Sequence, residues 1–205
     1  MSRAAILTVG AALLAVLVAV SLSRSPASAP AQAKVLKAGA FDPALPAPAF
    51  ALPGSAGSEV TLASYRGKVV LLTFGFTYCA TVCPTTLSTL AQAKRTLGAA
   101  GDAVQVIFVT VDPERDDAVH MRDYLAAFDP SFLGATGTPE ALAAMRKAYG
   151  VTAEKHGTGS DYVMGHTSSI FLIDKGGKLR GLMPFGREPA DFAHDITLLL
   201  AEPVA

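Results

Sequence analysis

The sequence predicts an α/β fold in which helices cover both faces of a mixed central sheet. Two apolar runs, over residues 69–76 and 104–112, lack the alternation of a half-exposed strand and therefore indicate strands buried on both faces. A helical segment follows each run, and strand pairs joined by turn residues stand at both ends of this region. The chain has 205 residues, of which 51% are hydrophobic and 17% charged, so it is long enough for one domain with a full core.

Residues 1–22 indicate a membrane anchor or signal segment. From Ala4 to Leu22 the chain carries no charge, and Arg3 and Arg24 flank this run. As a helix it would be about 28 Å long, close to the ~30 Å hydrocarbon core of a bilayer. The Ala-x-Ala sequences that follow are poorly placed for cleavage. The sequence therefore favours an uncleaved transmembrane helix, with a cleaved signal as the alternative.

Residues 23–45 are rich in Ala, Pro and Ser and show no sustained period, which is typical of a semi-extended tether. The folded domain is predicted over residues 46–205. Its first elements are two short strands, over residues 50–52 and 59–65, separated by turn-forming residues. This opening hairpin is expected to end near Gly67.

The buried strand over residues 69–76 leads directly into a helix. Pro84 is expected in its first turn, because proline lacks an N–H and is tolerated there, and the helix is predicted to continue to about residue 100. The later elements are predicted from amphipathic patterns, from Thr138 as an N-cap and from a Lys-Gly-Gly turn. They are helices over 116–128, 139–150 and 189–201, and strands over 168–174 and 178–185.

The chain has two cysteines, Cys79 and Cys83, which lie between the first buried strand and its helix. They could form a structural disulfide, a redox couple or two ligands of one metal ion. A disulfide here would close a short loop and stabilise the fold by about 2 kcal/mol at most. The Cβ atoms of residues four apart on a helical turn lie ~5 to 6 Å apart, whereas a disulfide requires about 3.8 Å. A helix N-terminus stabilises thiolates, which suits both a redox thiol and a metal ligand.

A third ligand would favour a metal site. Structural zinc requires four protein ligands, whereas soft copper(I) is suited to two thiolates and one imidazole. His120 and His194 are predicted on solvated helix faces, and His156 in an exposed glycine-rich loop. His166 immediately precedes the apolar strand over residues 168–174. It is therefore the best available third ligand.

Three segments together resemble the Sco/SenC proteins, thioredoxin-fold copper chaperones for cytochrome c oxidase assembly. The segments are GKVVLLTFGFTYCATVCPTTL, VTVDPERDD and MGHTSSIFLIDKGGKL, which occur in the family's order and spacing. The resemblance extends from about residue 50 to the C-terminus, and the anchor and tether also match the family's layout. It implies a thioredoxin-like fold for this domain.

The resemblance also implies the members of the site. Cys79, Cys83 and His166 match the family's three ligands and would bind one copper ion, as Cu(I) or Cu(II). Asp112 and Pro113 match an Asp-Pro pair at the end of the neighbouring strand, where they either shape the strand exit or act near the copper.

The resemblance further implies what the protein does and where. It would deliver copper to the dinuclear copper centre of cytochrome c oxidase subunit II, after receiving it from a copper donor chaperone or being prepared by a thiol reductant. The anchor would cross the bacterial inner membrane once, with the soluble domain facing the periplasm or cell exterior. Seventeen basic residues balance seventeen acidic ones, so the sequence indicates no nucleic-acid partner.

A second function fits the same cysteines. A membrane-anchored thiol-disulfide oxidoreductase would reduce client cysteines through a redox-active disulfide between Cys79 and Cys83. A peroxidase-like or redox-sensing role is a weaker alternative. Ala80, Thr81 and Gly165 depart from residues common in the family, and these changes are expected to tune copper affinity and redox potential.

Overall fold

The structure is a computed structural model that describes residues 35–203. The predicted membrane anchor and the first part of the predicted tether, residues 23–34, lie outside the described residues. Among residues 35–203, no helix has the length and apolar character needed to cross a membrane.

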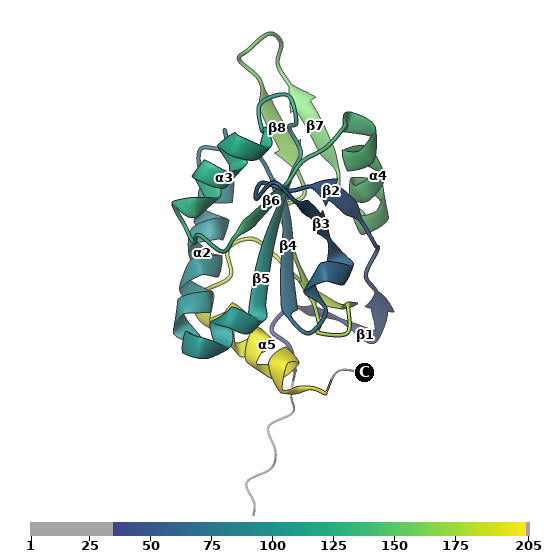
Figure 1. Cartoon of the computed structure of the whole chain (residues 1–205), viewed down its shortest axis with the longest axis vertical. Helices are drawn as coiled ribbons and strands as arrows, with labels where there is room; N and C mark the ends of the chain where they lie inside the picture. The colour runs from purple at the N-terminus through teal and green to yellow at the C-terminus, as the bar shows by residue number, and fades with distance from the viewer. Residues whose placement is uncertain (1–34, 204–205) are drawn as a thin grey trace, which may run out of the picture. The chain divides into compact units, whose positions relative to one another are not determined.

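A six-stranded mixed sheet forms the centre of the domain (Figure 1). Its strand order is β1-β10-β9-β4-β5-β6. The strands are β1 (Gly39–Pro46), β4 (Val69–Gly75), β5 (Val104–Thr110), β6 (Leu133–Ala135), β9 (Ile170–Ile173) and β10 (Lys178–Met183). Strands β4, β5 and β6 run parallel, β9 pairs antiparallel with β4, β10 pairs antiparallel with β9, and β1 pairs antiparallel with β10 at the edge. The mixed sheet predicted from the sequence is confirmed.

The two apolar runs form the adjacent central strands β4 and β5. They pair in parallel from Val69 opposite Val104 to Gly75 opposite Thr110, and every residue of both strands is buried. Their carboxyl ends therefore meet at one edge of the sheet, where groups that follow parallel strands face a common crevice.

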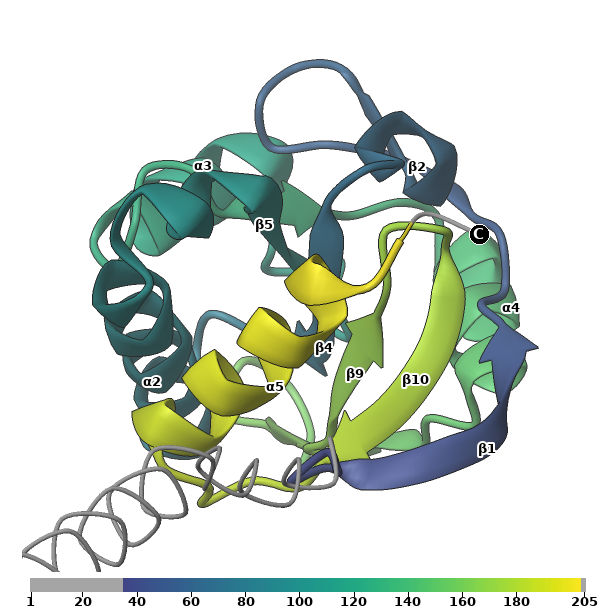
Figure 2. The same ribbon diagram turned by 90° about the horizontal axis from the view of Figure 1, so that it is seen from below.

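Helices cover both faces of this sheet (Figures 1 and 2). On one face, α2 packs against α5, and the ring of Tyr124 on α3 lies 6.2 Å from that of Phe108 on β5. On the other face, Tyr149 of α4 packs 6.0 Å from Phe74 of β4. The helices are α2 (Val82–Thr96), α3 (Ala118–Ala126), α4 (Pro139–Tyr149) and α5 (Pro189–Ala201), with 3-10 helices η1 (Leu62–Tyr65) and η2 (Gly98–Ala103).

Local signals set the helix boundaries. Thr138 caps α4 as predicted, because its hydroxyl oxygen accepts a hydrogen bond from the Ala141 backbone N–H at 3.2 Å. Helix α2 begins at Val82, so Pro84 lies within its first turn. The predicted continuation of α2 to residue 100 is wrong, since α2 ends at Thr96 and η2 follows it.

The end of the predicted tether requires a correction. Residues 39–46 form β1, which pairs antiparallel with β10 from Gly39 opposite Leu182 to Pro46 opposite Lys178. Just before β1, the buried carboxylate of Asp195 on α5 accepts hydrogen bonds from two consecutive backbone N–H groups. The folded domain therefore begins earlier than the residue 46 that the sequence predicted.

Two small hairpins complete the domain. Strands β2 (Ala51–Pro53) and β3 (Glu59–Thr61) form the predicted opening hairpin, but the second strand is shorter than predicted, because residues 62–65 form η1. Strands β7 (Ala153–His156) and β8 (Val163–His166) form a second hairpin that the sequence did not predict. This β7–β8 hairpin projects from the end of the molecule at which β4 and β5 finish (Figure 1).

Candidate metal centre

The two cysteines lie where β4 leads into α2. Cys79 is half-buried on the connecting loop, and Cys83 is buried in the first turn of the helix. Gly75 makes room for this close approach. A Cβ atom at Gly75 would lie 2.9 Å from the Cys83 Sγ and 2.5 Å from the ring of Phe108. The absence of a side chain at the last residue of β4 therefore lets Cys83 and Phe108 pack against the strand.

His166 reaches the same place from the end of β8. Its Nδ1 lies 2.9 Å from the carbonyl oxygen of Thr167. Because a carbonyl can only accept, Nδ1 carries the proton in this hydrogen bond, and Nε2 keeps a free lone pair. This Nε2 lies 3.8 Å from the Sγ of Cys83. The ring of Phe76 packs edge-on against the imidazole, with centroids 6.0 Å apart.

The two thiols differ in their ionisation. Burial opposes ionisation of Cys79, but hydrogen bonds, led by that of the Cys83 backbone N–H at 3.4 Å, hold its pKa below the usual value. Burial raises the pKa of Cys83 to about 12, and the nearby Cys79 and Asp116 add to the increase. Burial lowers the pKa of His166, so its imidazole is neutral near pH 7. Cys79 is therefore the readily ionised thiol, and Cys83 holds its proton.

The spacing of Cys83 and His166 fits one shared metal ion. Metal–sulfur and metal–nitrogen bonds of ~2.3 and ~2.0 Å let a single ion bridge a sulfur and a nitrogen 3.8 Å apart in a bent arrangement. Within residues 35–203, no three His, Cys, Asp or Glu side chains are gathered closely enough to hold a metal ion as they stand. Three-coordinate binding would therefore require Cys79, whose Sγ accepts a hydrogen bond from the Cys83 backbone N–H at 3.4 Å, to move toward the other two side chains.

The other three histidines lie outside this arrangement. His120 on α3 is exposed, as predicted, and its Nε2 lies 2.9 Å from the Thr77 hydroxyl. His194 lies beside Asp195 on α5. His156 is exposed, but it belongs to strand β7 rather than to a loop.

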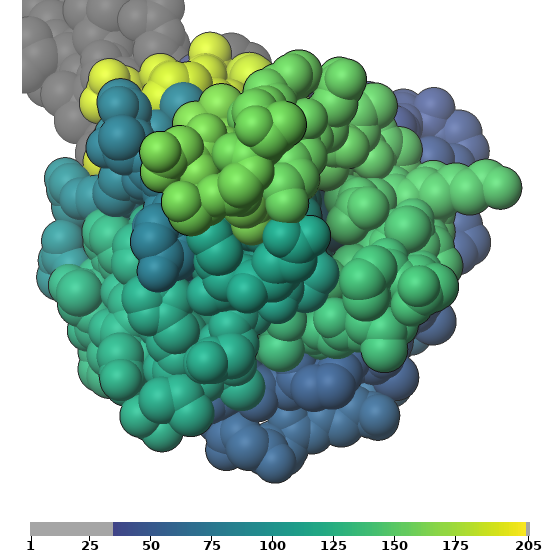
Figure 3. Space-filling view, turned by 90° about the horizontal axis from the view of Figure 1, so that it is seen from above, coloured from purple at the N-terminus to yellow at the C-terminus, as the bar shows by residue number. Residues whose placement is uncertain are grey.

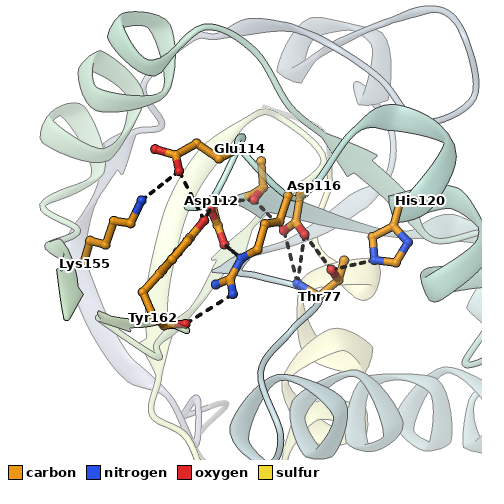
Figure 4. A network of polar contacts seen from close by, with 9 residues as sticks. Thr77, Asp112, Glu114, Asp116, His120, Lys155 and Tyr162 are labelled. Atoms are coloured by element: carbon orange, nitrogen blue, oxygen red, sulfur yellow. Dashed lines mark hydrogen bonds and ion pairs between the residues drawn. The ribbon is translucent and has the colours of Figure 1, made fainter. Parts of the chain in front are cut away.

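Asp112 follows β5 and lies beside the site without contacting its sulfurs or imidazole through a hydrogen bond. Its buried carboxylate accepts hydrogen bonds from the Tyr162 hydroxyl at 2.6 Å and from the Arg115 Nε at 2.5 Å (Figure 4). Pro113 directly follows it and is partly buried. Arg115 and Tyr162 were missed by sequence reasoning. The signal available was the cluster of charges directly after a buried strand.

A third missed residue is Asp116, which is fully buried. Its carboxylate accepts hydrogen bonds from the Thr77 hydroxyl at 2.5 Å, the Thr77 backbone N–H at 3.1 Å and the Thr110 hydroxyl at 2.7 Å (Figure 4). Burial raises the pKa of Asp116, although these hydrogen bonds oppose the increase. Asp116 thus fixes the loop two residues before Cys79.

A family model described as SCO1/SenC matches residues 40–201. The chain belongs to the SCO1/SenC family. This finding confirms the resemblance that the cysteine, Asp-Pro and histidine segments indicated, and it extends that resemblance to β1.

Sequence comparison with individual proteins agrees with this family assignment. The chain is 39% identical over 132 residues to "Protein SCO2 homolog, mitochondrial" of Mus musculus, a match that covers 62% of this chain and 52% of that protein. It is 35% identical over 133 residues to "Protein SCO1, mitochondrial" of Saccharomyces cerevisiae, covering 63% of this chain and 45% of that one. The match therefore spans about half the length of these curated relatives.

Solved structures share the fold. A structure of Bradyrhizobium japonicum ScoI with copper bound has a TM-score of 0.70 and 38% identity, and the match covers 75% of this chain and 98% of that one. The apo Sco1 protein of Thermus thermophilus has a TM-score of 0.69 and 38% identity, over 82% and 96% of the two chains. The thioredoxin-like fold expected for this SCO1/SenC protein is confirmed.

The structure also gives a physical context for Gly165. The imidazole of His156 lies across β8 at this position, because a Cβ atom at Gly165 would be 3.0 Å from the His156 Nε2. Glycine is thus the residue that lets His156 pack over the hairpin one residue before His166. Ala80 and Thr81 lie in the turn between Cys79 and the start of α2.

Proposed function

We propose that this SCO1/SenC protein is a metallochaperone that binds one copper ion through Cys79, Cys83 and His166. Copper is its cargo, carried as Cu(I) or Cu(II). The observation that carries the proposal is the 3.8 Å approach of the His166 Nε2 to the Cys83 Sγ. The third donor, Cys79, lies beside them, with its Sγ 3.4 Å from the Cys83 backbone N. The copper-bound relative with 38% identity supports the choice of metal.

The chemistry of the donors supports copper over zinc. Two thiolates and one neutral imidazole form a soft, three-donor set, which suits Cu(I), whereas structural zinc takes four protein ligands. The Nδ1 hydrogen bond to Thr167 fixes the His166 tautomer that presents Nε2 to the metal. Asp112 and Pro113 would act on the site indirectly, because they form the turn after β5 that positions Arg115.

A copper titration tests this proposal. The fully reduced chain is titrated with Cu(I) under anaerobic conditions against a chelator of known affinity, alongside His166→Ala, Cys79→Ser and Cys83→Ser. We expect one copper ion per chain and a loss of affinity in all three variants.

His156→Ala is the matched control, because His156 is an exposed histidine on the same hairpin. Its copper affinity is expected to equal that of the parent. A parent chain that binds no copper, or a His166→Ala variant with parental affinity, would overturn the assignment.

The delivery step rests on the family resemblance. We propose that the recipient is the dinuclear copper centre of cytochrome c oxidase subunit II, and that a copper donor chaperone or a thiol reductant prepares the protein. Half-buried Cys79 supports transfer, since an incoming thiolate can reach a metal at its exposed side. Mixing the copper-loaded chain with the isolated copper-binding domain of subunit II tests this, and transfer is measured by the appearance of the dinuclear centre's absorption.

The proposed location is the bacterial inner membrane, with one anchor and the domain on the outer side. The sequence of residues 1–22 supports this location. A C-terminal reporter enzyme that is active only outside the cytoplasm tests it. Activity is expected in intact cells, and an inactive fusion would reverse the orientation.

A second function, thiol-disulfide exchange, is favoured by the difference between the two thiols. The Cys79 thiolate would attack a client disulfide, forming a mixed disulfide and releasing one client thiolate. Cys83, after losing its proton to water, would attack Cys79 and release the second client thiol. The client disulfide is then reduced by two electrons, the protein holds a Cys79–Cys83 disulfide, and a thiol reductant must regenerate it. Reduction of a client disulfide by Cys83→Ser at the parental turnover would exclude this mechanism.

A further inference from the structure

Two segments must hold a fixed spacing for the three proposed ligands to meet. One is the cysteine loop, residues 76–81, which carries Cys79. The other is the β7–β8 hairpin, which ends at His166. The hairpin forms a separate two-stranded sheet, and most residues of its strands are exposed or partly exposed. Because an isolated two-stranded hairpin is marginally stable in water, its position depends on contacts with the rest of the domain.

Arg115 lies between these two segments. Its guanidinium carbon is 3.7 Å from the ring centroid of Tyr162, which directly precedes β8. The same carbon is 4.8 Å from the ring of Tyr78, the neighbour of Cys79, and 5.9 Å from the ring of Phe76. Phe76 in turn packs edge-on against His166. One cation therefore stacks on aromatic rings from both segments, an arrangement stabilised by cation–π attraction.

Hydrogen bonds fix Arg115 in this position. Its Nε donates to the Asp112 carboxylate at 2.5 Å, and its Nη1 donates to the Tyr162 carbonyl oxygen at 3.2 Å. The Tyr162 hydroxyl donates to the other Asp112 oxygen at 2.6 Å (Figure 4). The Asp112 carboxylate thus accepts hydrogen bonds from both the Arg115 guanidinium and the hydroxyl of the tyrosine on which that guanidinium stacks. We call Asp112, Arg115 and Tyr162 the Arg115 clamp.

The neighbouring contacts are more exposed. The Nζ of Lys155 on β7 lies 3.8 Å from the centroid of the Tyr162 ring and donates a hydrogen bond to the Glu114 carboxylate at 2.7 Å (Figure 4). This ion pair is largely solvated, and such pairs contribute little to stability. Asp112, by contrast, is buried, and Arg115 is only 18% exposed. The Arg115 clamp is therefore the principal polar connection between the hairpin and the turn after β5.

The space-filling view shows the end of the molecule at which the β7–β8 hairpin lies (Figure 3). In Figure 3 the green residues of β7 and β8 stand directly beside the teal residues that include α3. A hairpin that moved away from this surface would carry His166 away from Cys83.

We propose that Arg115 is a positioning residue that couples the β7–β8 hairpin to the cysteine loop and so sets the spacing of the metal ligands. Arg115 touches neither sulfur nor imidazole through a hydrogen bond. It acts through Tyr162 on the hairpin and through Tyr78 and Phe76 on the loop. Release of the clamp lets the hairpin open, which separates His166 from the thiols and speeds copper release. The copper part of this inference rests on the proposed function, whereas the coupling of the two segments does not.

Hydrogen exchange of the full chain, reduced and free of metal, tests the coupling directly. In Arg115→Ala, amide exchange is expected to be at least about tenfold faster than in the parent across residues 153–166 and 76–81, since both lose their shared contact. Exchange in the central strands β4 and β5 is expected to stay at the parental rate. Arg122→Ala is the matched control, because Arg122 is exposed and pairs only with its neighbour Asp123.

Copper provides the second readout. From chains loaded with Cu(I), release to a competing chelator is expected to be about tenfold faster in Arg115→Ala. With Cu(II), the thiolate-to-copper charge-transfer absorption of this variant is expected to differ from that of the parent and of Arg122→Ala. A residue that only stabilised the fold would raise exchange throughout the sheet and leave this absorption unchanged.

The outcomes separate the two proposals. If the parent binds no copper, the proposed function fails, and the exchange experiment still decides the coupling. If the parent binds copper but Arg115→Ala keeps the parental exchange in both segments, the coupling is overturned and the copper assignment stands. If Arg115→Ala does not fold, Tyr162→Phe decides, because it removes only the hydroxyl that donates to Asp112. Faster exchange is then expected in both residues 153–166 and residues 76–81, and parental exchange in either segment would overturn the coupling.

Discussion

The Sγ of Cys83 lies 3.8 Å from the Nε2 of His166, although 83 residues separate them in the sequence. The two side chains arrive from different elements, one from the first turn of α2 and the other from the end of a small hairpin. Neither is charged near neutral pH. Burial raises the pKa of Cys83 to about 12 and lowers that of His166. The pair is therefore a neutral thiol beside a neutral imidazole, and metal binding must displace the thiol proton.

Copper affinity is expected to increase with pH because of Cys83. A metal-bound thiolate has lost its proton, and a group with a pKa of about 12 still holds that proton throughout the range from pH 8 to 10. Each bound Cu(I) should therefore release about one proton from Cys83, so the apparent affinity should rise about tenfold per pH unit. Competition titrations at three pH values measure this slope.

Cys83→Ser serves as the control for this slope. Above the lowered pKa of Cys79, its residual copper binding should vary little with pH. A parental affinity that stayed constant from pH 8 to 10 would mean that Cys83 is either ionised in the free protein or not a ligand.

Alkylation should distinguish the two thiols. Cys79 is half-buried and its pKa lies below the usual value, whereas Cys83 is 3% exposed and its pKa is raised to about 12. Since the thiolate is the reactive form, Cys79 should react with iodoacetamide at least about tenfold faster at pH 7.5. Mass spectrometry of peptides from the reduced chain measures both rates. Equal rates in the native state would contradict the assigned difference, while equal rates in denaturant are expected.

The central strands of the fold could be predicted from the sequence because their apolar residues indicate that they are buried. Strands β4 and β5 are buried on both faces, and predominantly apolar runs are typical of that environment. Strand β1 is different, since most of its residues are exposed or partly exposed. It forms a strand because it pairs with the edge of β10, and the local sequence does not indicate that distant partner. The β7–β8 hairpin is similarly polar, and distant residues hold it in place.

The three proposed ligands could be chosen from the sequence, whereas their environment could not. Two cysteines at a strand-to-helix junction and one histidine before a strand are visible in the sequence. The difference between Cys79 and Cys83 is not visible, because it depends on the depth at which each sulfur lies. Arg115 and Tyr162 were likewise invisible as a pair, since 47 residues separate them and only the fold brings them together.

Gly75 is expected to be essential for the packing of Cys83. In Gly75→Ala the new Cβ would lie 2.5 Å from the Phe108 ring and 2.9 Å from the Cys83 Sγ. Overpacking of this kind costs about 1–3 kcal/mol, and it should also displace the sulfur and weaken copper binding. Urea unfolding of the metal-free chain measures the first effect, and copper titration measures the second.

Gly39→Ala is the control for Gly75. Its Cβ would meet only the Leu182 carbonyl oxygen, at an ordinary contact distance of 3.6 Å, so both quantities should stay near the parental values. If Gly75→Ala were as stable as the parent, the close packing of Gly75, Phe108 and Cys83 would be disproved.

The buried carboxylate of Asp195 should stabilise the start of the domain. It accepts hydrogen bonds from the backbone N–H groups of Lys37 at 2.7 Å and Ala38 at 2.9 Å, and so fixes the chain just before β1. Hydrogen bonds to charged groups contribute ~1.5–3 kcal/mol each. Asp195→Ala leaves two N–H groups without this acceptor and should lower the free energy of unfolding by about 3 kcal/mol.

Hydrogen exchange shows whether this loss is local. In Asp195→Ala, residues 37–46 should exchange faster than in the parent. The β7–β8 hairpin and the copper affinity should be unchanged, because Asp195 lies on α5 and makes no hydrogen bond to the proposed metal ligands. Asp191→Ala on the same helix is the control, since Asp191 forms only a partly exposed ion pair with Arg187. Protection of residues 37–46 that survived in Asp195→Ala would mean that pairing with β10 alone holds β1 in the sheet.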